Sequence, residues 1–369
     1  MSSDQEPSLW VALSLIPGLG GETYRSLLQN FGEPAKIFAA RPSALEKVVR
    51  APIARAIAAG PDQDTVAPTL KWLEETDNHI VTLADTDYPR GLLEIPDPPP
   101  LLYVKGRRGL LNQPALAIVG SRNATPQGLI NAQTFARFLS DSGWCIVSGM
   151  ALGIDGAAHR GALQGAASSI AVVGTGLDIV YPARHRDLAH ELAQIGALVS
   201  EFPIGTPSKS QNFPRRNRII SGISQGCLVI EAALQSGSLI TARLAAEQGR
   251  DVFAIPGSIH SPLAKGCHFL IKQGAKLVEN AQDILDEFGY PAAASTISPC
   301  QPAAATSEDE KQLRHCLGFD PIAIDALVAC SGLTSDSVCA ILLSMELAGQ
   351  VSSLPGGLFQ SCNHISTPD

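Results

Sequence analysis

Short apolar runs alternate with longer amphipathic stretches through the middle of the chain. The runs are apolar at nearly every position, which is typical of strands buried on both faces of a parallel sheet. They occupy residues 115–120, 144–149, 169–174, 197–201, 227–231 and 251–257. Segments with helical periodicity lie between them, for example residues 127–143. This alternation predicts an α/β domain with a Rossmann-like, doubly wound, mostly parallel sheet.

The N-terminal part has a different pattern. Residues 1–70 contain short helical periodicities, which prolines at 34, 42, 52, 61 and 68 interrupt, so we predict a small helical domain there. Two of its expected helices flank the hairpin Pro17-Gly18-Leu19-Gly20, an arrangement that resembles a helix-hairpin-helix or SAM-like unit. Such a hairpin can bind a phosphate through backbone amides, but Arg25 is the one cation in residues 8–32. We therefore favour a packing role for this hairpin.

The C-terminal part follows a segment rich in proline and alanine. Residues 71–288 are assigned to the Rossmann-like domain, residues 289–307 to a linker, and residues 308–369 to a third domain. In the third domain, three helical patterns precede two short strands, which is the order of a winged helix. Its third helix, residues 335–350, contains Asp336 and Glu346 and no Lys or Arg. We expect this helix to contact protein rather than duplex DNA.

Charge is distributed unevenly along the 369 residues. The net charge is −8, yet residues 101–280 contain 17 Lys and Arg against 10 Asp and Glu, giving +7. Residues 1–100 carry −6 and residues 281–369 carry −9. A basic middle between acidic ends indicates a localised site for an anionic partner.

Other sequence features indicate where in the cell the protein is located. No apolar run reaches the roughly 18 residues of a membrane span, and the N-terminus lacks the features of a signal peptide. The eight cysteines are scattered without a Cys-x-x-Cys pair, which favours reduced thiols over a metal site or a disulfide framework. We therefore expect a cytoplasmic protein with no membrane partner.

Small-residue turns follow several of the predicted strands. Gly120-Ser121-Arg122 follows the first strand of the series, and Gly149 ends the second. After the strand ending at Glu231, the turn containing Gly237 and Ser238 opens a helix that includes Thr241. The carboxyl ends of parallel strands share one edge, and a helix N-terminus binds anions, so this edge is a candidate phosphate site.

A basic segment precedes the strand at 227–231. It contains Lys209, Arg215, Arg216 and Arg218 beside Phe213 and Asn217. Cations that contact phosphates and an aromatic ring that stacks on bases are the elements of a single-stranded nucleic acid site. Two alternatives stay open: Phe213 could be a core residue, and Arg122 could pair with Glu231 instead of binding phosphate.

The sequence disfavours several kinds of catalytic site. There is no good G-x-G-x-x-G at the first strand, no P-loop, no nucleophile elbow and no metal-ligand spacing. Asp155 and His159 are spaced as an acid–base pair could be, but we favour Asp155 as a helix cap and His159 as a packed side chain. We therefore predict a non-catalytic protein without a cofactor.

Several motifs together resemble one family. These are GSRNAT at 120–125, SGMALGIDGAAHRGAL at 148–163, FPRRNRIISG at 213–222, EAALQSGSLITARLAAEQGRDVFAIPG at 231–257 and GCHFLIKQGA at 266–275. They resemble the DNA-processing protein A (DprA/Smf) family over about residues 80–288. The flanking domains resemble modules found in many members.

The resemblance implies a role in natural transformation. Family members bind and protect incoming single-stranded DNA, load the RecA recombinase on it while displacing single-strand binding protein, and form homodimers. The nucleic-acid site that we predict comprises Gly120, Ser121, Arg122, Gly149, Lys209, Phe213, Arg215, Arg216, Asn217, Arg218, Gly237, Ser238 and Thr241.

Two alternatives to this function remain. One is a nucleotide-processing hydrolase of the lysine-decarboxylase-like Rossmann group, which also has a small-residue turn before a helix. In this chain Glu247 lies at the wrong distance from the turn for the catalytic glutamate of those enzymes. The other is a scaffold whose acidic terminal domains dock proteins and whose DNA affinity is incidental.

Overall fold

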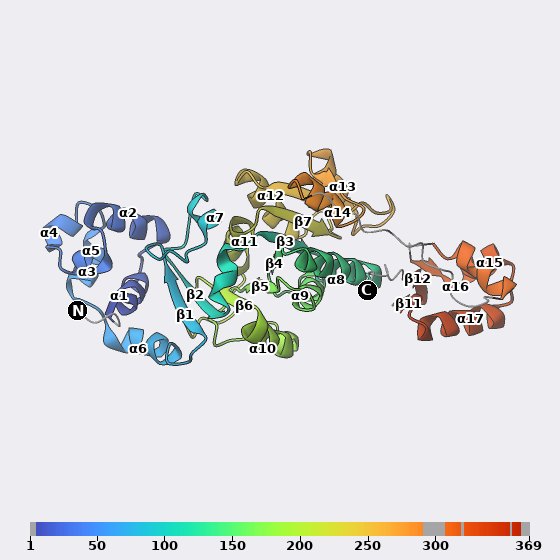
Figure 1. Cartoon of the computed structure of the whole chain (residues 1–369), viewed down its shortest axis with the longest axis horizontal. Helices are drawn as coiled ribbons and strands as arrows, with labels where there is room; N and C mark the ends of the chain where they lie inside the picture. The colour runs from blue at the N-terminus through green and yellow to red at the C-terminus, as the bar shows by residue number, and fades with distance from the viewer. Residues whose placement is uncertain (1–4, 291–306, 319–320, 355, 363–369) are drawn as a thin grey trace.

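A computed structural model describes residues 5–290, 307–318, 321–354 and 356–362. A nine-stranded sheet lies at its centre (Figure 1). The strands are β1 (Asn78–Thr82), β2 (Leu101–Gly106), β3 (Ala115–Gly120), β4 (Cys145–Ser148), β5 (Ser169–Val172), β6 (Ala197–Ser200), β7 (Gly226–Ile230), β8 (Asp251–Ala254) and β9 (Lys276–Leu277). The six strands predicted in the alternating series are all present and differ from their predicted bounds by at most three residues.

The strand order explains where a ligand can bind. It is β1-β2-β6-β5-β4-β3-β7-β8-β9, and the pairs from β6 to β9 are all parallel. From β3 the chain adds β4, β5 and β6 on one side, then returns to add β7, β8 and β9 on the other. The switch point of this doubly wound sheet therefore lies between β3 and β7. In such sheets ligands bind beyond the carboxyl ends of the strands at this point.

Helices cover both faces of the parallel part. One face packs against α11 (Asn212–Ile223), α12 (Ser238–Glu247) and α13 (Lys265–Lys272). The other packs against α8 (Pro126–Asp141), α9 (Ile154–Leu163) and α14 (Gln282–Glu287), and farther along against α10 (Arg186–Ile195). Ala117 and Val119 of β3 face the first group, and Leu116 and Ile118 face the second, because side chains alternate along a strand. Shorter elements are α7 (Arg90–Leu93), η1 (Arg108–Asn112) and η2 (Ala183–His185).

The other edge of the sheet is antiparallel. β2 pairs antiparallel with both β1 and β6, which turns the first two strands against the direction of the rest. The apolar runs at residues 79–85 and 101–106 predict strands here but do not predict their direction. The sheet is thus mixed at this edge and parallel through the switch point.

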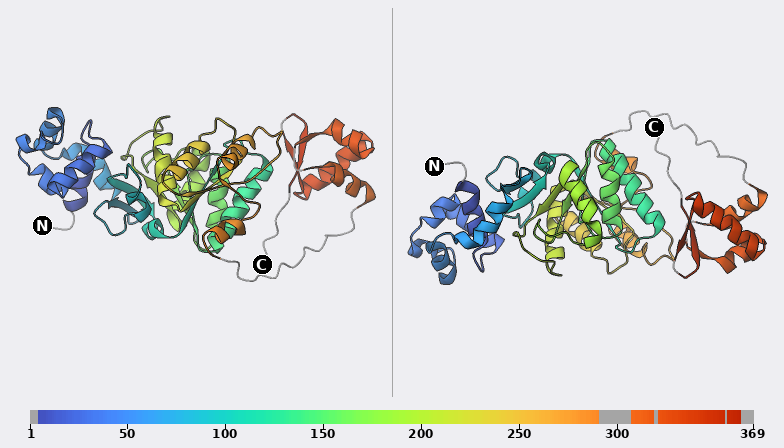
Figure 2. Two further views of the ribbon diagram at one scale, coloured as in Figure 1. Left: turned by 90° about the horizontal axis from the view of Figure 1, so that it is seen from above. Right: turned by 90° about the horizontal axis from the view of Figure 1, so that it is seen from below.

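The N-terminal helices lie beside this antiparallel edge (Figures 1 and 2). They are α1 (Gln5–Ser14), α2 (Gly21–Phe31), α3 (Pro34–Phe38), α4 (Pro42–Leu45), α5 (Ala51–Ala58) and α6 (Gln63–Trp72). Trp10 and Tyr24 stack with centroids 5.9 Å apart, and Trp72 meets Tyr103 of β2 edge-on at 6.0 Å. All four rings belong to one hydrophobic cluster with residues of β5 and β6. The helical part and the sheet therefore share a core, and α6 ends two residues beyond the boundary predicted at 70.

The hairpin between α1 and α2 packs against the sheet domain. Arg25 of α2 donates to Asp97 at 2.7 Å and to the carbonyl of Pro98 at 2.8 Å. Its guanidinium is therefore engaged within the chain, as the packing role favoured from the sequence requires.

The C-terminal unit has the predicted element order. It comprises α15 (Glu308–Cys316), β10 (Ile322–Ala323), α16 (Ile324–Ser331), α17 (Ser335–Leu347), β11 (Val351–Leu354) and β12 (Leu358–Ser361). The strands form a small antiparallel sheet in the order β10-β12-β11, the wing of a winged helix. Leu313, Leu327 and Leu342, one from each helix, meet in its core.

One expectation about the cysteines is wrong. Cys316 and Cys330 form a disulfide that joins α15 to α16, where the sequence favoured reduced thiols throughout. The two helices pack side by side and bring the Cα atoms to 5.9 Å, a separation that a disulfide spans. Cys145, Cys227 and Cys267 of the sheet domain are buried thiols, as expected. Cys300 lies outside the described residues.

No single helix in the described ranges is long and apolar enough to cross a membrane. α16 and α17 reach the required length and composition only as a pair, with a bend of 111° between them.

Candidate nucleic-acid interface

A cavity of about 770 Å³ opens at the switch point between β3 and β7. Its walls come from the turn after β3, the loop after β5, helix α11 and the N-terminus of α12. Among its lining residues are Gly120, Ser121, Arg122, Asn123, Tyr181, Ser208, Ser210, Phe213, Arg216, Asn217, Ser236, Gly237, Ser238 and Thr241. Nine of the thirteen residues predicted from the sequence line this cavity, although they come from three separate segments of the chain.

Arg122 is the exposed cation of the cavity wall. Its side chain makes no ion pair within the described residues, and its guanidinium carbon lies 6.0 Å from the centroid of the Phe213 ring. The alternative partner Glu231 is occupied elsewhere, because its carboxylate accepts from the amide and hydroxyl of Thr125 at 2.8 and 2.5 Å. The guanidinium is therefore available for a ligand.

The turn after β3 needs its glycine because position 120 is closely packed against the end of the neighbouring strand β7. A Cβ on Gly120 would lie 1.9 Å from the carbonyl oxygen of Ile230. The amide of Ser121 donates to the carbonyl of Glu231 at 2.7 Å, which ties the two strand ends together. Glu231 and Met150 both have positive φ, 51° and 60°, so β7 and β4 turn sharply where they end. The sequence did not predict either conformation.

The N-terminus of α12 forms the opposite wall. Gly237 precedes the helix and is exposed, and Ser238 and Thr241 are buried behind it. The hydroxyls of Ser236 and Ser238 are 2.7 Å apart. The amides of Leu239 and Ile240 donate to carbonyls of the turn, whereas the amide of Gly237 has no acceptor among the described residues. This terminus therefore offers one backbone donor and the positive end of the helix dipole.

Arg216 is buried and forms hydrogen bonds within the protein interior. The sequence placed it among the nucleic-acid ligands, but the residue is only 4% exposed. Its guanidinium donates to the carbonyls of Gly149 at 2.6 Å and Val172, and to Oδ1 of Asn217 at 3.0 Å. Burial lowers the pKa of this guanidinium to about 10. Arg216 thus links α11 to the ends of β4 and β5, and positions Asn217 in the cavity wall.

Arg215 and Arg218 face away from the cavity. Arg218 makes a bidentate pair with the buried carboxylate of Glu201 at 2.8 and 2.9 Å, and also contacts Asp97. Arg215 contacts the same carboxylate of Glu201 at 2.9 Å. Burial raises the pKa of Glu201 in spite of these cations. The two arginines are therefore committed to ion pairs, a role that the sequence did not predict.

Lys209 lies on an exposed loop at the rim. Its neighbours Ser208 and Ser210 line the cavity, while Lys209 itself does not. Gly149 also lies behind the cavity wall, where its carbonyl accepts from Arg216 and its amide donates to Asp155.

Two aromatic rings meet at the mouth of the cavity. Phe213 is half-buried, and its ring packs against Gly174, where an added Cβ would lie 3.1 Å from the ring. Tyr181 is 47% exposed, and its ring centroid is 5.5 Å from that of Phe213 with the planes tilted by 41°. Phe213 is therefore only partly buried and is not a core residue. The sequence analysis missed Tyr181, which lies 32 residues upstream in the loop after β5.

Asp155 and His159 do not form an acid–base pair. Asp155 is the second residue of α9 and does not cap it; its carboxylate instead accepts from the amides of Gly149 and Ala151 at 3.1 and 3.3 Å. Burial raises its pKa. His159 is fully buried with Nδ1 2.7 Å from the Ser169 hydroxyl, and burial lowers its pKa to about 3. The packed role expected for His159 is confirmed, and the capping role expected for Asp155 is wrong.

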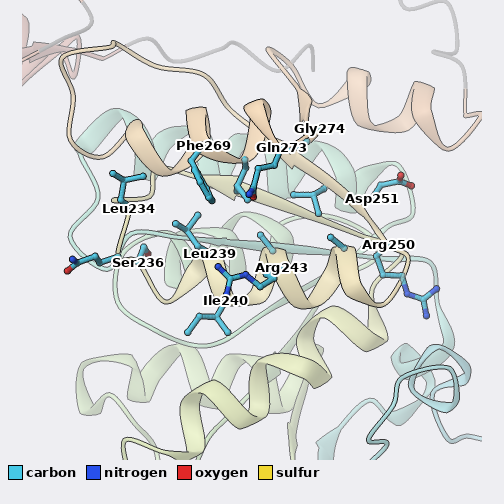
Figure 3. Close-up of a pocket in the computed structure, with 16 residues that line it drawn as sticks. Leu234, Ser236, Leu239, Ile240, Arg243, Arg250, Asp251, Phe269, Gln273 and Gly274 are labelled. Atoms are coloured by element: carbon cyan, nitrogen blue, oxygen red, sulfur yellow. The ribbon is translucent and has the colours of Figure 1, made fainter.

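A second hollow, of about 910 Å³, lies between α12 and α13 (Figure 3). Leu239 of α12 faces Phe269 and Gln273 of α13 across it, with Leu234 at one end and Ile240 on the side of α12 that points away from α13. Leu234, Ile240 and Phe269 are 61%, 41% and 40% exposed. Its lining combines these apolar side chains with polar and charged ones, including Arg243, Asp251 and Gln273.

Comparisons with known proteins place the chain in a family. The model of "DNA recombination-mediator protein A" matches residues 79–289, which include every strand and helix that forms the switch-point cavity. The chain belongs to the DNA recombination-mediator protein A family. A second model, the DprA winged helix domain, matches residues 298–357 and agrees with the C-terminal unit described above.

Two curated proteins are similar to this chain in sequence. Protein Smf of Escherichia coli (strain K12) is 45% identical over 301 residues, which cover 79% of this chain and 80% of the relative. The DNA processing protein DprA of Streptococcus pneumoniae is 47% identical over 209 residues, covering 57% of this chain and 74% of that protein.

Two solved structures of family members share the fold. DNA processing protein A from Streptococcus pneumoniae superposes with a TM-score of 0.67 at 36% identity, covering 78% of this chain and 98% of that one. DNA processing protein A from Helicobacter pylori, described for its single-stranded DNA binding mode, gives 0.52 at 32% identity and covers 57% and 95%. These structures confirm the Rossmann-like prediction, and the DprA winged helix model confirms the winged-helix prediction.

Proposed function

We propose that this protein binds single-stranded DNA in the cavity at the switch point between β3 and β7. The observation that carries the proposal is Arg122, an exposed guanidinium without a carboxylate partner in the described residues, beside two aromatic rings and a helix N-terminus. Arg binds phosphate bidentately, and the helix terminus adds a second positive region on the opposite wall.

The aromatic rings favour a single strand over a duplex. Tyr181 and Phe213 can stack on bases only where the bases are unpaired and splayed from their neighbours. The Helicobacter pylori relative, described for its binding of single-stranded DNA, supports this choice. We assign no catalytic role to the cavity, since its carboxyl group, Asp155, is engaged by two backbone amides.

Fluorescence anisotropy of a labelled oligo(dT) tests the proposal with Arg122→Ala. We expect the wild type to bind single strand in preference to duplex and to weaken steeply with salt. Losing one phosphate contact should reduce the slope of log K against log salt by about 0.7 and lower the affinity several-fold.

The matched control is Arg137→Ala. It removes the same charge from an exposed arginine on α8 whose partner is Asp141 on the same helix, outside the cavity. Equal binding by the wild type and Arg122→Ala, or equal losses in both variants, would exclude the cavity as the phosphate site.

We further propose that the bound strand is passed to a recombinase. On this proposal the protein acts in the cytoplasm during natural transformation, protects the incoming strand, displaces single-strand binding protein and loads RecA for recombination. Its support is membership of the recombination-mediator family. RecA-driven strand exchange on oligomers coated with single-strand binding protein, with and without the chain, is the test; no acceleration by the chain would reject loading.

We also propose a homodimer. The hollow between α12 and α13 leaves Leu234, Ile240 and Phe269 exposed on the Rossmann-like domain, and an apolar surface of this kind is where a second copy would pack.

The acidic winged helix lacks cations on α17, as the sequence showed, so we assign it to protein contact rather than to duplex DNA.

A further inference from the structure

Tyr181 is an exposed aromatic side chain that lines the cavity at the switch point. It comes from the loop after β5, whereas Phe213 belongs to α11, so the two rings meet only in the folded chain. Tyr181 is nearly half exposed, and such exposure of an aromatic ring leaves apolar area in contact with water.

Phe213 is already surrounded on several sides. Its ring packs against Gly174, and the guanidinium carbons of Arg122 and Arg216 each lie 6.0 Å from its centroid. The ring of Tyr181 covers a further side. Phe213 therefore has limited free area for a base, and Tyr181 has the more accessible ring of the pair.

The distance between the rings decides how bases can use them. A base inserted between two rings needs about twice the roughly 3.4 Å stacking step of nucleic acids, or about 6.8 Å. The centroids of Tyr181 and Phe213 are only 5.5 Å apart and the planes are tilted, so no base fits between them. A base can stack only on the outer face of the pair.

We propose that Tyr181 is a base-stacking residue of the DNA site and forms its outer aromatic platform. This inference rests on the proposed function and adds a contact that is neutral and directed at bases. Arg122 and the terminus of α12 hold phosphates, while Tyr181 holds a base next to the one near Phe213. Because Tyr181 contacts a base and not a phosphate, we expect its loss to weaken binding to bases and to leave phosphate binding unchanged.

The first test compares Tyr181→Leu with the wild type on two labelled oligomers of equal length, oligo(dT) and an abasic strand. Leucine keeps an apolar side chain against Phe213 but has no π-face. We expect affinity for oligo(dT) to fall at least about fivefold, with an unchanged salt slope and unchanged affinity for the abasic strand. Tyr290→Leu is the control, since Tyr290 is 52% exposed and packs on Trp144, away from the cavity.

A second variant reports contact directly. Trp10, Trp72 and Trp144 are all buried, so in Tyr181→Trp the introduced indole is the exposed fluorophore. We expect oligo(dT) to quench its emission and the abasic strand to leave it nearly unchanged. Equal responses to both strands would overturn base stacking.

A double variant separates stacking from support of Phe213. If Tyr181 stacks on a base of its own, Tyr181→Leu weakens binding further when it is added to Phe213→Leu, and the contact between the two rings makes the losses couple rather than add strictly. A double variant no weaker than Phe213→Leu alone would show that Tyr181 only holds Phe213 in place, which would overturn the proposal. A wild type that does not bind oligo(dT) would instead reject the proposed function itself.

Discussion

At the scale of single residues, the four arginines predicted to bind nucleic acid have different roles in the structure. Arg122 is exposed at the cavity, Arg216 is buried behind it, and Arg215 and Arg218 pair with Glu201. The sequence predicted that Lys209, Arg215, Arg216 and Arg218 contribute to one cationic site. The three arginines instead leave α11 in different directions, and Glu201, from a separate segment, pairs with two of them.

Arg216→Ala should therefore behave as a stability variant. Its loss leaves the carbonyls of Gly149 and Val172 without their buried donor, so we expect the free energy of unfolding to fall by about 2–5 kcal/mol. Urea denaturation followed by circular dichroism measures this. Arg215→Ala, in the same helix but half exposed, should lose about 1 kcal/mol or less. Equal stabilities of the wild type and Arg216→Ala would contradict the interior role.

At the scale of elements, the sequence was most informative where periodicity is strong. The buried strands from β3 to β8 are apolar at nearly every position, and all were predicted close to their observed ends. The positive φ of Glu231 and Met150 was not predictable, because both residues lie in turns that are held by contacts with other residues. Ser121 donates to the carbonyl of Glu231, and the amides of Gly149 and Ala151 donate to Asp155. Tyr181 was missed because no local pattern links it to Phe213.

The N-terminus of α12 offers a test that separates binding from stability. Gly237 has helical φ and open space around its Cβ position, so Gly237→Asp should fold without strain and, as an acid at a helix N-terminus, should not destabilise the chain. The added carboxylate should repel phosphate and weaken oligo(dT) binding by about 1 kcal/mol or more at low salt. Anisotropy and thermal unfolding measure both effects, with Gly237→Asn as the neutral control. Undiminished binding by Gly237→Asp would place the phosphates elsewhere.

At the scale of the whole molecule, the sequence predicted the fold class of the sheet domain and the C-terminal winged helix. It could not predict that the N-terminal helices share one hydrophobic cluster with the sheet, since contacts such as that of Trp72 with Tyr103 cross between segments. It also could not predict the disulfide of the winged helix, because the pairing of Cys316 with Cys330 depends on how α15 packs on α16.

The proposed homodimer belongs to this scale. Phe269→Asp places a charge in the hollow between α12 and α13, and we expect it to convert a dimer into a monomer at micromolar concentration. Light scattering after size-exclusion chromatography gives the mass. Leu93→Asp, at a 55% exposed leucine of α7, is the control and should remain dimeric. A wild type that is monomeric, or a Phe269→Asp variant that stays dimeric, would reject this surface.

The contact between Gly149 and Arg216 also constrains how this protein can change over generations. A Cβ at position 149 would lie 2.4 Å from the guanidinium, so a larger residue there would displace Arg216 from its buried hydrogen bonds. Replacing Arg216 alone leaves the carbonyl of Gly149 without its donor. Each single step is therefore unfavourable, and the two positions can drift only together. Variant libraries that randomise both positions at once should recover folded combinations that neither single library contains.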